Sequence, residues 1–214
     1  MSEAPRQPRI ENEPTLMITL GWYAAVGGVV FVVSILIADF VVPEHDWIAD
    51  TISDLGAGRF EYIVDIGLYS LSASFIALAL LAAHVHMGGW GWSVGIVGLA
   101  VLGLVVFLVG ARNEYGDSDN DGWVIHSYLV YLLGLLMALI PALLHSGARR
   151  ASATYGNCLV AVGVMWTISA PWFFFLPTTV DGLYERYLGL IALALIFTLS
   201  HFFIRHGRAF DDRR

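Results

Sequence analysis

Six apolar blocks, each about 20 residues long, constrain this chain more than any other feature of its sequence. Hydrophobic residues make up 57% of the chain and charged residues only 14%. About 20 apolar residues in an α-helix cross the roughly 30 Å hydrocarbon core of a bilayer. The blocks do not alternate in polarity as the strands of a membrane β-barrel would. They cover residues 16–42, 62–85, 92–111, 123–144, 155–176 and 183–204.

The blocks predict an all-α fold, a polytopic membrane bundle of six transmembrane helices. A helix satisfies all its backbone hydrogen bonds internally, as hydrocarbon demands. Pro43 is expected to stop the first helix, because proline cannot continue the hydrogen-bond ladder. We therefore expect one six-helix domain over residues 16–206, flanked by polar tails at residues 1–15 and 207–214. The predicted location is the cell membrane.

The distribution of arginine predicts that both termini are cytoplasmic. With that orientation, the cytoplasmic segments hold eight arginines and the outer loops hold three. Short cytoplasmic loops carry an excess of basic residues. Most of the acidic residues then fall at the outer face, which would attract cations. The arginines expected inside are Arg6, Arg9, Arg149, Arg150, Arg205, Arg208, Arg213 and Arg214; those expected outside are Arg59, Arg112 and Arg186.

Several classes of site are absent from the sequence. The single cysteine, Cys158, allows neither a disulfide nor a thiolate metal cage within one chain. No phosphate-binding glycine loop, nucleophile elbow or HExxH helix occurs. Glycines such as Gly27, Gly28 and Gly103 are interpreted as points of close helix packing. The expected partners are membrane lipids and not nucleic acid; a second copy of the chain or another membrane protein is left open.

The polar segment 46–62, between the first two apolar blocks, is the centre of the predicted site. Ionisable residues here and at nearby helix ends lie at or near membrane depth, where a charge is costly and is often kept for function. We expect them to form a polar pocket at the outer face. The alternative is a pairing network that only fixes helix ends. The candidate ligand-binding residues are Ser53, Asp54, Glu61, Asp65, His126, Arg186 and Asp39.

A weaker metal-site candidate lies between the third and fourth blocks. Asp117, Asp119 and Asp121, followed by Gly122, match the first half of the calcium-binding loop pattern. The glutamate expected at the twelfth position of that loop is replaced by Tyr128. The segment is therefore either a site for Ca²⁺ or another divalent cation at the outer face, or an acidic surface turn.

Residues 51–69, TISDLGAGRFEYIVDIGLY, resemble a prokaryotic membrane protein family of unknown function related to the damage-regulated autophagy modulators and the fibroblast-growth-factor-receptor-activating proteins. That group has six helices and an Ile-Ser-Asp-x-Gly motif before a glutamate that leads into helix 2; Ile52–Gly56 and Glu61 match it. His126 and the segment 182–186 are weaker matches. The resemblance implies a role in membrane lipid handling.

Three hypotheses for function follow from these observations. The first is a lipid-binding or membrane-organising protein with an outer-leaflet headgroup site. The second is a lipid-headgroup enzyme, metal-assisted or not, in which Asp54 or Asp65 works with His126 as acid and base. The third is a cation or proton transporter, which is disfavoured because the middle of each block holds few polar groups.

Overall fold

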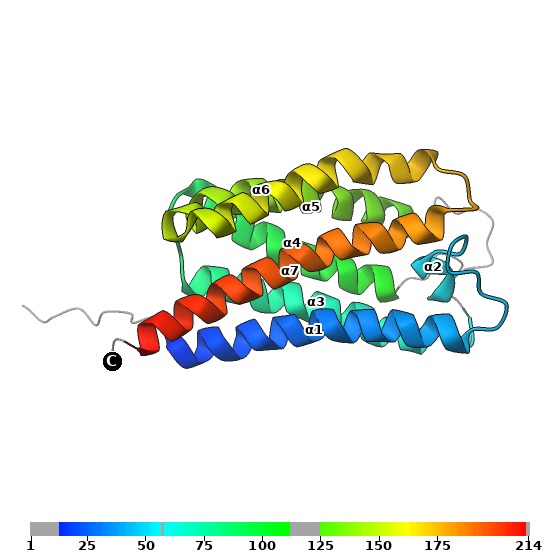
Figure 1. Cartoon of the computed structure of the whole chain (residues 1–214), viewed down its shortest axis with the longest axis horizontal. Coiled ribbons are helices and arrows are strands. Elements are labelled where there is room, and N and C mark those ends of the chain that lie inside the picture. The colour runs from blue at the N-terminus through cyan, green and yellow to red at the C-terminus, as the bar shows by residue number, and fades with distance from the viewer. Residues whose placement is uncertain (1–12, 57, 112–124, 213–214) are drawn as a thin grey trace, which may run out of the picture.

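The computed structural model describes residues 13–56, 58–111 and 125–212, and these residues form helices joined by short connections (Figure 1). Six of the helical segments are long and apolar enough to cross a membrane, with α6 and η1 together counting as one. The predicted all-α fold with six spans is therefore confirmed. The elements are α1 (Pro14–Val41), α2 (Ile52–Leu55), α3 (Glu61–His84), α4 (Trp90–Ala111), α5 (Ile125–Ala151), α6 (Ala153–Ser169), the 3₁₀ helix η1 (Ala170–Phe175) and α7 (Asp181–Asp211).

The six spans form a closed ring in which each packs mainly against two neighbours, and α7 also touches α3 and α5. The order around the ring is α1, α3, α4, α5, α6 and α7, and α7 packs back onto α1. The contact between α6 and α7 is the least extensive of the six. Figure 1 shows α2 at one end of the bundle, which we call the α2 end; α1 begins and α7 finishes at the other, which we call the terminal end.

Glycine permits the closest helix crossings, as the sequence predicts. A Cβ on Gly27 of α1 would lie 2.6 Å from the carbonyl oxygen of Ser70 in α3. A Cβ on Gly103 of α4 would lie 2.8 Å from the side chain of Ile76 and 3.1 Å from the carbonyl oxygen of Ser72. The hydroxyl of Ser72 donates to the Gly103 carbonyl across the same crossing, at 2.6 Å. Small residues bring these backbones together.

Two helices run beyond their apolar blocks at the terminal end. α5 continues to Ala151, past the block that ends at residue 144, and α7 continues to Asp211 rather than 204. Arg149 and Arg150 lie in the last turn of α5 and Arg208 in the last turn of α7. Cations near a helix C-terminus interact favourably with its dipole, so the helices extend past the hydrophobic limit.

Candidate functional site

The short helix α2 is built by a local hydrogen-bond motif. Thr51 is its N-cap: the Thr51 hydroxyl oxygen accepts from the backbone N–H of Asp54 at 3.1 Å. The Asp54 carboxylate in turn accepts from the backbone N–H of Thr51 at 2.7 Å and from its hydroxyl at 2.8 Å. This reciprocal capping box satisfies donors that a helix start leaves open. Asp54, a candidate ligand residue, is thus an integral part of the turn that creates α2.

Backbone contacts fasten α2 and its preceding loop to the start of α7. Glu185 Oε2 accepts from the backbone N–H of Ile52 at 2.6 Å. The backbone N–H of Leu183 donates to the carbonyl of Ile48 at 2.9 Å. Gly182 lies so close to the backbone of Asp50 that a Cβ there would overlap with it. The position of α2 therefore depends on α7, which is about 130 residues away in the chain.

A cluster that we call the Arg186 clamp joins α1, the α1–α2 loop and α7. Arg186 Nη2 donates to Asp39 Oδ1 at 2.6 Å, and its Nη1 donates to the carbonyls of Asp50 at 2.9 Å and Gly182 at 3.0 Å. His45 lies inside the cluster with 3% of its side chain exposed. Its Nε2 is 3.1 Å from both Asp39 Oδ1 and Arg186 Nη2, and its Nδ1 is 3.4 Å from Asp50 Oδ2.

Two of the candidate residues, Ser53 and His126, come together at the α2 end. Ser53 Oγ lies 3.3 Å from Nε2 of His126, although the two are 73 positions apart. His126 is in the first turn of α5 and is 6% exposed. A buried imidazole is normally held by hydrogen bonds. The hydroxyl of Ser53 provides one such contact, to Nε2 of His126.

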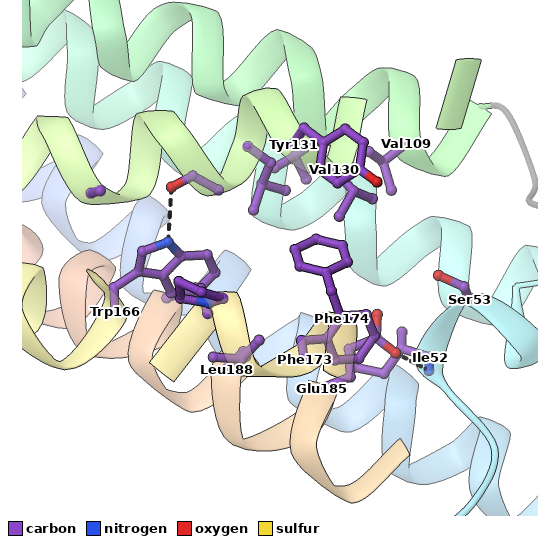
Figure 2. Close-up of a pocket in the computed structure, with 18 of the residues that line it drawn as sticks. Ile52, Ser53, Val109, Val130, Tyr131, Trp166, Phe173, Phe174, Glu185 and Leu188 are labelled. Carbon is purple, nitrogen blue, oxygen red and sulfur yellow. Dashed lines mark hydrogen bonds between the residues drawn. The ribbon is translucent and has the colours of Figure 1, made fainter. Parts of the chain in front are cut away.

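The Ser53–His126 pair lies at one end of a half-open cavity of about 470 Å³. Figure 2 shows Ser53, Ile52 and Glu185 at the α2 end and Trp166 at the deep end, with apolar side chains between them. Cavities that bind small ligands typically measure about 300–1,000 Å³ and are mainly apolar with a few polar groups. Glu185 and His126 are the only carboxylate and imidazole among the described residues that line it.

The walls of the cavity come from both sides of the ring. At the deep end, Trp166 Nε1 donates to the carbonyl of Gly134 at 2.9 Å, which joins α6 to α5 (Figure 2). Between α5 and η1, the rings of Tyr131 and Phe174 pack with centroids 5.2 Å apart. These two side chains are 48% and 52% exposed. This aromatic pair is therefore a wall that faces the surroundings of the helix bundle.

The remaining candidates lie outside the cavity. Glu61 begins α3 and Asp65 lies one turn further on; Oδ1 of Asp65 is buried and has no hydrogen-bond partner among the described residues. Asp117, Asp119 and Asp121 fall outside the part of the chain that the structure describes. Within residues 13–56, 58–111 and 125–212, no three His, Cys, Asp or Glu side chains group as a metal site requires.

The structure thus separates the candidate residues into two neighbouring assemblies. Asp39 and Arg186 belong to the clamp, whereas Ser53 and His126 line the cavity together with Glu185, an acid in the first turns of α7. Sequence analysis missed His45. Its position among the acids that follow Pro43 was the available signal, because an imidazole between carboxylates commonly pairs with them.

The fold and the cavity define a multi-pass helical membrane protein with a mainly apolar, half-open cavity. Over residues 25–201 the chain matches the family described as "Protein of unknown function (DUF998)". The match covers most of the chain and all six spans in whole or in part, so the protein belongs to this family. No curated protein and no solved structure matches it.

Proposed function

We propose that this protein binds one membrane amphiphile, with the apolar chain in the cavity and the headgroup beside Ser53, His126 and Glu185. The cavity supports this proposal most strongly, because the one carboxylate and the one imidazole among its described lining residues lie toward the α2 end of a mainly apolar lining. An amphiphile has the same division between a polar end and an apolar body. A lipid chain gains little hydrophobic free energy when it moves from the bilayer into this cavity, because both environments are apolar. Specificity therefore rests on the shape of the cavity and on its polar end.

The polar end favours a headgroup that is neutral and carries a hydroxyl or an ester. Glu185 lies at the polar end of the cavity, and no arginine is among the described residues that line the cavity. The guanidinium of Arg186 is engaged with Asp39 and two backbone carbonyls in the clamp. A phosphate would therefore meet a carboxylate without a compensating charge, which is costly in a low-dielectric site. The ligand class that fits is an acylglycerol, a long-chain alcohol or a similar uncharged lipid.

The bilayer offers a direct route to this cavity. Tyr131 and Phe174 form a wall between α5 and η1 and are half-exposed on the outside of the bundle. Exposed aromatic side chains in a membrane protein face lipid or its interface. The cavity is half-open beside these two rings, so a lipid could enter it from the side without crossing water.

Filling the cavity tests the binding function. A Cβ on Gly134 would meet nothing within 4 Å, and Gly134 lines the cavity, so Gly134→Leu should occupy the chamber without a clash. Its matched control is Leu135→Phe, because Leu135 is the next residue of α5 and is 55% exposed. Native mass spectrometry should find one neutral lipid on the wild type and the control and little on Gly134→Leu. An empty wild type, or equal lipid on all three proteins, contradicts the proposal.

The Ser53–His126 contact favours a second candidate function, hydrolysis of an ester in the bound lipid. Ser53 Oγ would attack the carbonyl carbon while His126 Nε2 takes the hydroxyl proton and passes it to the departing alcohol; water would then release the fatty acid from Ser53. The 3.3 Å separation is slightly long for this transfer, but such contacts tighten when substrate binds. The sequence analysis paired His126 with Asp54 or Asp65 as acid and base. In the structure, His126 lies beside Ser53 instead.

Ser53→Ala separates this candidate from simple binding. If the protein is a hydrolase, a diacylglycerol supplied in bicelles is cleaved by the wild type and not by Ser53→Ala, while both proteins retain lipid. Cleavage that continues in Ser53→Ala rules out Ser53 as the nucleophile, and absence of cleavage in the wild type leaves binding as the function.

The proposed kinship with the autophagy-modulator and receptor-activating group rests on Ile52–Gly56. In this chain that motif forms α2 and its cap, and it brings Ser53 to the cavity. A structure of a member of that group should therefore show the same capped turn beside a cavity between the later helices. A member whose motif lies in an extended loop away from such a cavity would contradict the relationship.

A further inference from the structure

A second groove lies at the terminal end of the bundle, far from α2. It has a volume of about 720 Å³ and runs between the first turns of α6 and the last turns of α7. Residues 154, 155 and 158 line it from α6, residue 151 lines it from the end of α5, and residues 198, 201, 202, 205 and 209 line it from α7. The residues from α6 and those from α7 follow helical spacing, so one face of each helix lines the groove.

The groove has a basic character. Arg205, His201 and His206 line it, and none of its described lining residues is an aspartate or a glutamate. His201 Nδ1 lies 3.0 Å from the hydroxyl oxygen of Tyr155 across the groove. When that hydroxyl donates to Nδ1, the hydrogen of the neutral imidazole is on Nε2. The groove therefore offers donors from Arg205 and His201 to an anionic ligand.

Arg205 differs from Arg186 and Arg150, which are both held by hydrogen bonds to other parts of the bundle. Arg186 is held in the clamp, and Arg150 donates to the carbonyls of Met87 at 2.6 Å and Gly88 at 3.0 Å. Arg205 is exposed and has no hydrogen bond or ion pair with any residue in the described part of the chain. A guanidinium presents several donors in a planar fork that matches phosphate oxygens.

The other half of the groove is apolar and extends into the membrane span. Phe197 and Cys158 line this half, and Phe197 lies eight positions before Arg205, which is roughly 12 Å along a helix. The groove thus has a basic end at the border of the span and an apolar end within it. Basic pockets between transmembrane helices are sites at which anionic lipid headgroups bind.

We infer that this groove binds an anionic phospholipid, with its phosphate on Arg205 and His201 and an acyl chain along Phe197 and Cys158. The site is independent of the proposed cavity ligand: it lies at the opposite end of the bundle and selects for negative charge, whereas the cavity disfavours it. The phospholipid belongs to the leaflet on the side of the chain termini.

The test compares two arginines of the same helix. Arg205→Gln removes the proposed contact, and Arg208→Gln removes an exposed charge three residues further on that does not line the groove. Full-length protein in phosphatidylcholine nanodiscs is titrated with phosphatidylglycerol, and bound lipid is counted by native mass spectrometry. We expect Arg205→Gln to bind about fivefold more weakly than the wild type, and Arg208→Gln to bind within twofold of it.

Three results would overturn the inference. Equal weakening by both variants would show that only the general surface charge attracts the lipid, and no weakening by Arg205→Gln would show that the groove is not the site. Glycerol 3-phosphate supplies the same phosphate chemistry without acyl chains; competition by it at concentrations equal to those of the lipid would assign the groove to a soluble phosphate instead. Neither variant alters a buried residue, so thermal unfolding should match the wild type.

Discussion

Replacing Arg186 with glutamine is expected to destabilise the α2 end more than any other single polar change there. Arg186 is the cation of the clamp, bound to the Asp39 carboxylate and to two backbone carbonyls. Glutamine cannot reach all three acceptors and carries no charge. The Asp39 carboxylate would remain partly buried beside His45 without its arginine.

The size of the effect follows from burial. Removing one partner of a buried ion pair costs about 3–5 kcal/mol, because the other charge remains buried and unpaired. The side chain of Arg186 is 14% exposed and that of Asp39 is 18% exposed. Water therefore solvates the pair in part, and we expect a loss of about 3 kcal/mol, at the low end of that range.

Reversible unfolding in mixed detergent micelles measures this loss. Asp39→Asn and the double variant with Arg186→Gln complete a double-mutant cycle, in which the double variant should lose at least about 1 kcal/mol less than the sum of the single losses. Arg208→Gln is the matched control and should unfold like the wild type. An unchanged unfolding free energy for Arg186→Gln, or strict additivity in the cycle, would refute the role of the clamp.

Two further predictions concern the fold and its orientation. Gly182→Ala should lose about 1–3 kcal/mol, because the new Cβ would overlap with the backbone of Asp50; Gly189→Ala, whose Cβ would be 3.9 Å from Phe31, should be close to neutral in the same unfolding assay. We also propose that both termini are cytoplasmic, so a green fluorescent protein fused to the C-terminus should fluoresce and alkaline phosphatase fused there should be inactive; the reverse pattern contradicts this orientation.

The spans could be predicted from sequence because the bilayer imposes one simple rule on length and polarity. Their helices begin and end within a few residues of the apolar blocks at most positions, as at α1, which stops at Val41 before Pro43. The exceptions, α5 and α7, run past their blocks because arginines can continue a helix into water. Hydropathy describes the membrane boundary and not the helix boundary.

The candidate site could be predicted only in part. The rule that a charge at membrane depth is costly and is often kept for function pointed to His126 and Arg186 as members of one pocket. The structure divides them, because Arg186 turns toward Asp39 and His45 while Ser53 and His126 face the cavity. Which way a side chain points depends on the rotation of its helix, and hydropathy carries little information on that rotation.

The sequence by itself determined an all-α membrane protein with six spans, since the length and polarity of each block are local properties. The short helix α2 was not predicted, although its Thr51–Asp54 capping box lies within four residues and is visible in the sequence. Only the tertiary structure decided that an apolar cavity exists, that Ser53 meets His126 across 73 positions and that Arg205 lines a second groove. These features arise where non-adjacent helices leave space or meet, and helix packing depends on the summed fit of many side chains rather than on any local pattern.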